Sequence, residues 1–498
     1  KPRYLRAPLA VLEDHPAGEP ARDLVQHYDD LLDEVELVAR IDGSDEIGHT
    51  EPFGLFIGLR HTSDIEREAG GFARYLVGGS STGTPYFYPR YPGQRQAPRD
   101  DLEEHLGKKL GENFEGESIT FHDTKTQSRT IVESGWRETP LAYVLLKAKD
   151  LVVHAGQGVM YAEATDELVE LAELLECPVY TTILGKSGFP ETHPLSLGSG
   201  GPSTTAQANK YLKESDLVFG VGCSFTKTNF AQAIPQGKTM VHLTNDEDAI
   251  GREFKTEYAM LGDAKLVLRQ LLDELKSQAG SARPKNQVLQ DDIKFVKEAW
   301  LAQWMPKLTS EDVPMNPYRV VWDLMHTVDL DNTIITHESG SAREYLSPFW
   351  EARAPRSFIG WGKSTQLGYS LGLAMGAKLA EPDKLCINVM GDLAFSTVGL
   401  DVETAVRCNI PTMTIVINNA FMSIYDDSRF PVAIEKYNIK SLSGEFSEVA
   451  QAMGAYTEKI TAPGDIIPTI KRGIAETEAG NAVVLEFITK DEGEYSKF

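Results

Sequence analysis

The sequence is poor in cysteine, has fewer basic than acidic residues, and lacks long apolar runs. Its four cysteines among 498 residues lie too far apart for a metal knuckle, so we interpret them as reduced thiols of a cytoplasmic protein. Seventy-three acidic residues against 49 basic ones give a net charge of −24. That charge argues against nucleic acid or an anionic membrane as a main partner. No apolar run approaches the roughly 20 residues that span a bilayer.

The length is enough for about three domains, and the 41% apolar content fits a protein with substantial cores. Alternating strand and helix patterns predict two α/β domains with doubly wound parallel sheets, preceded by an unassigned α+β segment. The expected boundaries run as follows: an N-terminal segment 1–40, the unassigned segment 41–140, a central Rossmann-like domain 141–275, a polar linker 276–292 and a final domain 293–498.

The unassigned segment contains three expected strands, at residues 53–59, 118–122 and 130–133. Residues 78–98 are rich in Gly, Pro and Tyr and are interpreted as an irregular loop. His49 and Glu51 stand in a short polar span that could form a metal or acid/base site. A solvated polar turn is the favoured interpretation of that span.

The central domain is expected to begin with a strand at residues 151–155 that runs into Gly156-Gln157-Gly158. A helix at 164–175 follows, and further strands are expected at 178–184, 216–221 and 239–243. The two glycines of the turn could cradle a dinucleotide phosphate. We favour the simpler explanation, a tight turn that lets a helix pack on a strand.

The final domain contains a strand–helix–strand unit with polar residues at both strand ends. An apolar run at 385–390 stops at Gly391-Asp392, and another at 413–417 stops at Asn418-Asn419. A helical pattern lies between them, and Ser396 or Thr397 is expected to cap its start. Such a crossover places the two strands parallel in one sheet, so Asp392 and Asn419, 27 positions apart, should meet at its ligand-binding edge.

Two oxygen-bearing side chains at that edge suit Mg²⁺, which also takes waters and phosphate oxygens as ligands. Backbone N–H groups after Asp392 and Asn419 would then face the phosphate. An ordinary strand–turn–helix unit of an α/β core is the alternative explanation.

Two further turns accompany this unit. His337-Glu338-Ser339-Gly340-Ser341 follows an expected strand at 333–336, and residues 365–372 lead into a helix that runs through residue 380. We interpret His337 and Glu338 as turn residues beside the pocket. Leu367 could be an ordinary core residue at a glycine-rich helix start.

Together these stretches resemble the thiamine diphosphate enzymes of the acetolactate synthase, 2-oxoacid decarboxylase and 2-hydroxyacyl-CoA lyase type, over roughly residues 141–498. The family's motif is Gly-Asp-Gly followed by Asn-Asn, and Leu393 replaces the small third residue here. The resemblance implies that Asp392, Asn419 and the carbonyl of Phe421 bind Mg²⁺. It implies cofactor contacts from the following residues: Ser339, Gly340, Ser341, Leu367, Gly391, Leu393, Ala394, Phe421 and Met422.

The resemblance also implies a role for Leu367, which would lie under the cofactor and hold its two rings in a bent arrangement. The implied activity makes or breaks a carbon–carbon bond beside a carbonyl of a small 2-oxo acid or acyl substrate. An acetolactate synthase-like carboligase or 2-oxoacid decarboxylase comes first, and a 2-hydroxyacyl-CoA lyase second. The other alternative is a non-catalytic or regulatory homologue with a partner-binding N-terminal segment. Some relatives bind FAD or ADP in the central domain.

Family members activate the cofactor with a glutamate from a separate pyrimidine-binding domain. Residues 1–140 do not show the alternation of strands and helices of such a domain, although residues 2–12 resemble its final strand. Glu51 is the one candidate for a stand-in. We therefore expect a homo-oligomer, or pairing with a pyrimidine-binding domain on another chain.

Overall fold

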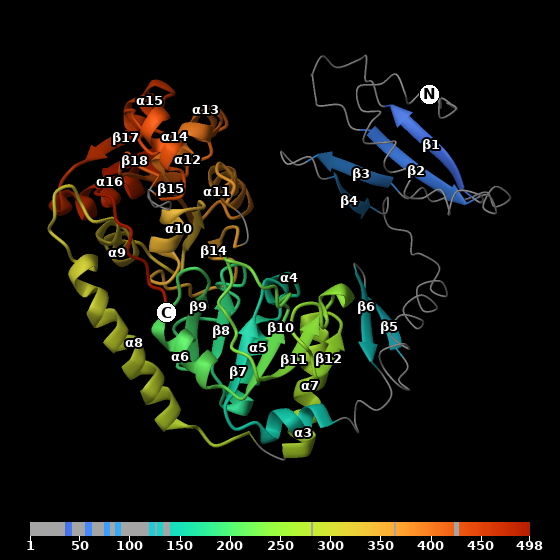
Figure 1. The fold of residues 1–498 in the computed structure, drawn as a ribbon. Coiled ribbons are helices and arrows are strands. Elements are labelled where there is room, and N and C mark those ends of the chain that lie inside the picture. Colours follow the sequence, from blue (N-terminus) through green and yellow to red (C-terminus); the bar gives the residue numbers. More distant parts are fainter. Residues whose placement is uncertain are drawn as a thin grey trace. The chain divides into compact units, whose positions relative to one another are not determined.

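A computed structural model describes residues 140–279, 282–362, 365–422 and 428–498, together with the backbone of six strands between residues 35 and 132 (Figure 1). It divides into two units, Lys1–Leu110 and Gly111–Phe498. Four strands of the first unit form an antiparallel sheet in the order β1-β2-β3-β4. They are β1 (Val35–Ile41), β2 (Leu55–His61), β3 (Arg74–Gly79) and β4 (Pro85–Arg90). A separate antiparallel pair, β5 (Ile119–Thr124) and β6 (Gln127–Val132), follows in the second unit.

The three strands expected in this region overlap β2, β5 and β6. The irregular loop expected at 78–98 is wrong in part, because β4 lies inside it. Tyr86, Phe87 and Tyr88 have high strand propensity, which the prolines on either side obscured. β4 is an edge strand, where proline is tolerated because one side of the strand needs no partner.

The next sheet is six-stranded and parallel, in the order β12-β11-β10-β7-β8-β9. Its strands are β7 (Leu151–Ala155), β8 (Val179–Thr182), β9 (Ser196–Gly200), β10 (Leu217–Val221), β11 (Thr239–Thr244) and β12 (Tyr258–Leu261). Its helical elements are α3 (Pro140–Lys147), α4 (Gly158–Tyr161), α5 (Thr165–Leu175), α6 (Ala206–Glu214), η4 (Glu247–Ala249) and α7 (Ala264–Ala279).

The last sheet is also six-stranded and parallel, in the order β14-β13-β15-β16-β18-β17. Its strands are β13 (Thr333–His337), β14 (Phe358–Ile359), β15 (Leu385–Gly391), β16 (Met413–Asn418), β17 (Tyr456–Ile460) and β18 (Val483–Ile488). The first helices around it are α8 (Gln287–Leu308), α9 (Pro317–Thr327), α10 (Ser341–Leu346), α11 (Ser370–Ala380) and α12 (Asp392–Val398). The remaining ones are η5 (Gly399–Asp401), α13 (Val402–Arg407), α14 (Pro431–Tyr437), α15 (Phe446–Ala452), η6 (Pro463–Asp465) and α16 (Ile466–Glu478). Two parallel sheets with flanking helices confirm the predicted fold class.

Apolar side chains cover both faces of the last sheet, because successive strand residues point in opposite directions. Ile415 and Leu485 belong to one core cluster, and Val416 and Val484 belong to another. Parallel sheets are normally buried on both faces. A polar residue in such a strand is therefore buried as well.

The helix expected between the two polar strand ends begins earlier than predicted. α12 starts at Asp392, directly after β15, so Ser396 and Thr397 do not cap its start. The Ser396 hydroxyl instead donates to the carbonyl of Asp392, inside the helix. The expected linker, 276–292, overlaps the end of α7 and the start of α8. The domain boundaries stay a prediction.

Candidate functional site

A cavity of about 370 Å³ lies at the carboxyl ends of β13, β15 and β16. Every residue that the sequence predicted to bind the metal or the cofactor lines it. These residues come from four turns of the chain: Ser339–Ser341, the turn with Leu367, and the two strand ends with Asp392 and Asn419. The parallel order β13-β15-β16 brings them together at one edge, where open α/β sheets bind ligands.

The Asp392 side chain is 4% exposed and lies at the junction of β15 and α12. Its two oxygens accept the backbone N–H groups of Leu393, at 2.7 Å, and Ala420, at 2.8 Å. Burial raises the carboxyl pKa from 3.8 to about 6, and the N–H donors oppose part of that rise. A buried carboxylate held by neutral donors has a negative charge that a cation would neutralise. The residue therefore fits the metal role that its sequence position implies.

The turn after β16 brings Asn419 and Phe421 to the same cavity. Ala420 has a φ of 58°, in the left-handed region that non-glycine residues rarely adopt. Its N–H is shared between Asp392 and Asn418, at 2.8 and 3.0 Å, and the N–H of Phe421 donates to the side-chain oxygen of Asn419 at 2.9 Å. An amide oxygen and a carbonyl beside one carboxylate form an oxygen donor set that suits Mg²⁺.

The backbone N–H groups that follow the two strand ends have a different role from the predicted one. Those of Leu393 and Ala420 were expected to face a phosphate, but both donate to Asp392. The reason is that α12 begins at Asp392 itself, which brings the carboxylate within reach of the following amide. Leu393, the departure from the family motif, is half-buried and lines the cavity.

The turn after β13 places Ser339, Gly340 and Ser341 along the cavity. Gly340 has φ 81° and ψ −151°, a conformation open in practice to glycine alone. α10 starts immediately afterwards, and the hydroxyl of Ser341 lies 2.8 Å from that of Tyr495. A hydroxyl-bearing turn at a parallel strand end is a suitable place for a phosphate group.

Glu338 links this turn to the one that carries Leu367. Its carboxylate is fully buried and accepts the N–H of Ser339 at 3.2 Å, the N–H of Gly368 at 3.0 Å and the hydroxyl of Ser370 at 2.9 Å. Gly368 directly follows Leu367, so the bond to Glu338 holds the backbone beside that half-buried side chain in the cavity. Burial raises the pKa of the Glu338 carboxyl.

The structure corrects the prediction for His337 and extends the one for Glu338. His337 is the last residue of β13 rather than a turn residue, and its burial lowers the imidazole pKa to about 3. Glu338 is near the pocket, as expected, but joins two of its turns. A glutamate directly after an apolar strand was a signal in the sequence, although nothing there indicated its partners.

The other wall of the cavity comes from parts of the chain that the sequence did not connect with it. Asn229 and Phe230, from the central part, line it, and so does Lys497 at the far end of the chain. The segment before Lys497 is fixed on the protein: Ser496 exchanges two hydrogen bonds with Thr204, at 2.6 and 2.8 Å. No local sequence pattern predicts such contacts.

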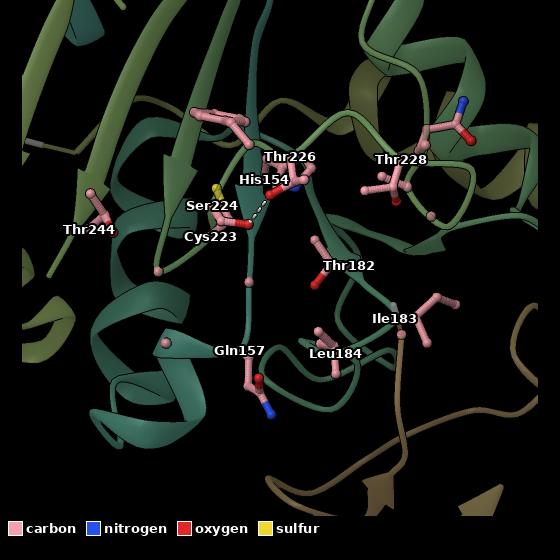
Figure 2. Close-up of a pocket in the computed structure, with 18 of the residues that line it drawn as sticks. His154, Gln157, Thr182, Ile183, Leu184, Cys223, Ser224, Thr226, Thr228 and Thr244 are labelled. Carbon is pink, nitrogen blue, oxygen red and sulfur yellow. Dashed lines mark hydrogen bonds between the residues drawn. The ribbon is translucent and has the colours of Figure 1, made fainter. Parts of the chain in front are cut away.

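A second cavity, of about 470 Å³, lies at the carboxyl ends of β7, β8, β10 and β11 (Figure 2). Gly156-Gln157-Gly158 forms part of its wall, but the glycines have a packing role. A Cβ on Gly156 would lie 2.4 Å from the carbonyl oxygen of Gly222, and Gly158 donates its N–H to that same oxygen. The tight-turn explanation is therefore supported. Binding of FAD or ADP stays a prediction.

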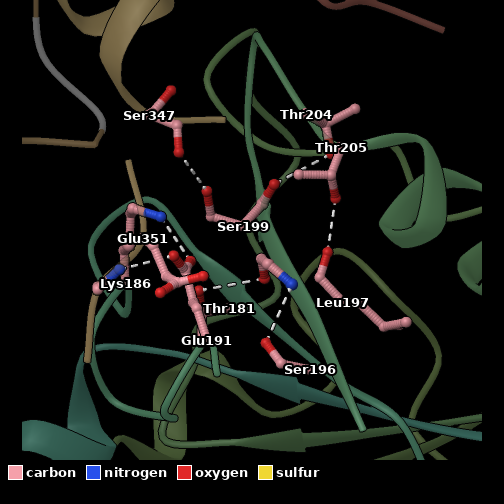
Figure 3. Close-up of polar contacts among 12 residues, drawn as sticks. Thr181, Lys186, Glu191, Ser196, Leu197, Ser199, Thr204, Thr205, Ser347 and Glu351 are labelled. Atoms are coloured by element: carbon pink, nitrogen blue, oxygen red, sulfur yellow. Dashed lines mark hydrogen bonds and ion pairs between the residues drawn. The ribbon is translucent and has the colours of Figure 1, made fainter. Parts of the chain in front are cut away.

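A polar seam joins the two parallel-sheet regions (Figure 3). Ser199 donates its hydroxyl to the carbonyl of Ser347 at 3.1 Å. The carboxylate of Glu191 accepts the N–H of Ala352 at 2.9 Å and also pairs with the buried ammonium of Lys186. These contacts fix the central strands against the segment that follows α10.

Among the described residues, no group of three His, Cys, Asp or Glu side chains is arranged to hold a metal ion, and a site built on one carboxylate would not form such a group. In the same part of the chain, no helix is long and apolar enough to cross a membrane. Glu51 and His49 lie outside the described residues.

Comparison with known proteins gives two family matches. The model described as "Thiamine pyrophosphate enzyme, central domain" matches residues 139–271. The model described as "Thiamine pyrophosphate enzyme, C-terminal TPP binding domain" matches residues 338–487. The second range contains every residue predicted to bind the metal or the cofactor.

Among curated relatives, a probable acetolactate synthase large subunit of Methanocaldococcus jannaschii is 30% identical over 354 residues, covering 68% of this chain and 57% of the relative. A probable acetolactate synthase large subunit of Methanococcus aeolicus is 28% identical over 341 residues, covering 66% and 57%. A glyoxylate carboligase of Escherichia coli O157:H7 is 26% identical over 347 residues, covering 67% and 58%. The chain thus spans less than two thirds of the length of these relatives. Since the two family models match in order over the two parallel sheets, the chain belongs to the thiamine pyrophosphate enzymes.

Proposed function

We propose that this protein is a thiamine diphosphate- and Mg²⁺-dependent enzyme that makes or breaks a carbon–carbon bond beside a carbonyl. The observation that carries the proposal is the single cavity at the ends of β13, β15 and β16. Four turns, which the sequence marked in three separate stretches, line that one cavity. The parallel strand order alone brings strand ends together, but it does not by itself supply a carboxylate, an amide and hydroxyl groups to one cavity.

Within this proposal, Asp392, the side chain of Asn419 and the carbonyl of Phe421 hold Mg²⁺. Ser339, Gly340 and Ser341 contact the diphosphate from the β13 side, and Gly391, Leu393, Ala394 and Met422 enclose it from the other turns. When bound, thiamine diphosphate supplies a ring that stores the electron pair released at the carbonyl carbon. The chain's own contribution is to bind, orient and shield that group.

Leu367 and Glu338 provide the orientation in this account. Leu367 lines the cavity and packs against the cluster around Phe395 and Met390. Glu338 fixes the next residue, Gly368, against the β13 turn. An apolar side chain whose backbone is held in place beside the cavity could keep two rings of a bound cofactor close together. Leu367 would thereby orient the bound cofactor for reaction.

The reaction we favour is an acetolactate synthase-like carboligation or a 2-oxoacid decarboxylation, on a small 2-oxo acid. Support comes from the names of the relatives, two acetolactate synthase large subunits and a glyoxylate carboligase. We propose that the activating glutamate comes from a pyrimidine-binding domain that pairs with this cavity. Residues 141–498 account for the central and diphosphate-binding parts, and the first 140 residues lack the alternating pattern of such a domain.

The test is turnover of 2-oxo acids by this 498-residue chain, purified free of other chains and assayed with thiamine diphosphate and Mg²⁺. We expect loose cofactor binding and little turnover from the chain alone. We expect carbon–carbon chemistry once a chain that contains a pyrimidine-binding domain is added. Robust activity of the isolated chain that disappears in Glu51→Gln would place the activating acid in the N-terminal segment and contradict the proposed pairing.

A further inference from the structure

Glu486 is a fully buried carboxylate in the middle of β18. One of its oxygens accepts the side-chain NH₂ of Asn418 at 2.7 Å. The other accepts the N–H of Ser447, at 2.8 Å, and its hydroxyl, at 2.7 Å. These three donors are neutral. Burying a carboxylate among neutral donors is costly, so its presence in an otherwise apolar strand calls for a role beyond packing.

The carboxylate determines which way the amide of Asn418 faces. Both oxygens of Glu486 already act as acceptors, so the NH₂ of Asn418 points toward Glu486. The amide oxygen of Asn418 must then point the other way, and it accepts the N–H of Ala420 at 3.0 Å. Glu486 thus orients the acceptor of the Ala420 N–H, although Glu486 does not contact Ala420 itself.

Ala420 is the residue whose conformation shapes the turn after β16. Its left-handed φ of 58° is unfavourable for a residue with a side chain, so external contacts must hold it. Its N–H is bonded to Asn418 and to Asp392. The turn in turn presents Asn419 and Phe421 to the cavity.

We propose that Glu486 is a positioning residue for the metal–diphosphate site, acting through Asn418 on the Ala420 turn. The proposal rests on the proposed function, because it assigns the turn's oxygens to Mg²⁺. Outer partners that orient ligand groups commonly change metal affinity by 10- to 100-fold when they are altered. The sequence gives a signal, a single Glu within the apolar run Val483-Val484-Leu485-Glu486-Phe487.

The test exchanges donor and acceptor between the two residues. In Glu486→Gln, the one remaining side-chain oxygen accepts the N–H and hydroxyl of Ser447. The NH₂ of the new glutamine then faces the NH₂ of Asn418, and two donors oppose each other. Relieving that clash turns the Asn418 amide and removes the acceptor of Ala420. Combining Glu486→Gln with Asn418→Asp restores every donor–acceptor pair and keeps the net charge, because the carboxylate simply moves from residue 486 to residue 418.

The measurement is the affinity for Mn²⁺ in the presence of thiamine diphosphate, read from the electron paramagnetic resonance signal of free Mn²⁺. We expect about 10- to 100-fold weaker binding in Glu486→Gln, and recovery to within a few-fold of wild type in the double variant. Glu403→Gln, which alters an exposed glutamate on α13 away from the turn, should bind like wild type.

The possible outcomes separate the two proposals. Wild type that fails to bind Mn²⁺ with thiamine diphosphate contradicts the proposed function itself. Wild type that binds, with Glu486→Gln binding equally well, overturns the positioning role and leaves the function intact. Urea unfolding of each variant distinguishes positioning from folding. If the double variant regains stability but not affinity, Glu486 is a structural residue only.

Discussion

Replacing Glu338 with alanine should loosen the cavity and destabilise the protein together. Its carboxylate accepts the N–H groups of Ser339, Gly368 and Ser370 and the hydroxyl of Ser370. Alanine leaves these donors without that acceptor, in a place where the Glu338 side chain is fully buried. The β13 turn and the Leu367 turn would then no longer share a fixed contact.

The expected magnitude follows from those contacts. Leaving one buried donor unsatisfied costs about 1 to 3 kcal/mol. Four donors that act together, the longest bond being 3.4 Å, with some relief from removing a buried charge, give a loss of about 3 to 5 kcal/mol in the free energy of unfolding. Glu338→Gln retains one acceptor oxygen and should lose about 1 to 2 kcal/mol.

Urea unfolding followed by circular dichroism measures the loss, and titration with thiamine diphosphate and Mg²⁺ measures the effect on the cavity. We expect stability to fall in the order wild type, Gln variant, Ala variant, and cofactor affinity to fall in the same order. Glu381→Ala, at the exposed end of α11, is the control and should change stability by under about 1 kcal/mol. An Ala variant as stable as the control would refute the linking role of Glu338.

Three further outcomes are expected. The raised pKa of Glu338 means that the folded state keeps its proton longer than the unfolded state as pH rises. The free energy of unfolding should therefore fall as pH rises from about 4.5 to the raised pKa, and unfolding curves of Glu338→Gln at several pH values should show a smaller fall. Leu367→Ala should slow turnover of the active assembly by about 10- to 100-fold while cofactor affinity changes little, whereas parallel losses would make Leu367 an ordinary packing residue. Asn419→Ala should weaken Mg²⁺-dependent cofactor binding by roughly tenfold in calorimetry, less than loss of the charged ligand Asp392; an unchanged affinity would remove Asn419 from the metal site.

Much of the site could be predicted because it depends on local signals. Apolar runs that stop at Gly391-Asp392 and at Asn418-Asn419 mark parallel strand ends, and parallel strands align their ends at one edge. Periodicity likewise located β7, β10 and β11 in the central sheet. In these places the fold follows from local sequence patterns.

The features that could not be predicted depend on contacts between distant segments. β9 and β12 were missed because Ser196–Gly200 is small and polar, and Tyr258–Leu261 is too short to show a period. Lys497 reaches the cavity only through the fixed contacts of Ser496 with the central part. The role of Glu338 likewise depends on a turn thirty residues away, which no local pattern reveals.

We propose that one cavity holds the metal–diphosphate end of thiamine diphosphate through Asp392. Calorimetric titration of the 498-residue chain with thiamine diphosphate, with and without Mg²⁺, tests it most directly, alongside Asp392→Ala. We expect Mg²⁺-dependent binding to wild type and a loss of at least about 100-fold in the variant, or about 2.7 kcal/mol, because the proposed carboxylate ligand is gone. Equal affinity in the two proteins, or binding to wild type that is indifferent to Mg²⁺, would contradict it.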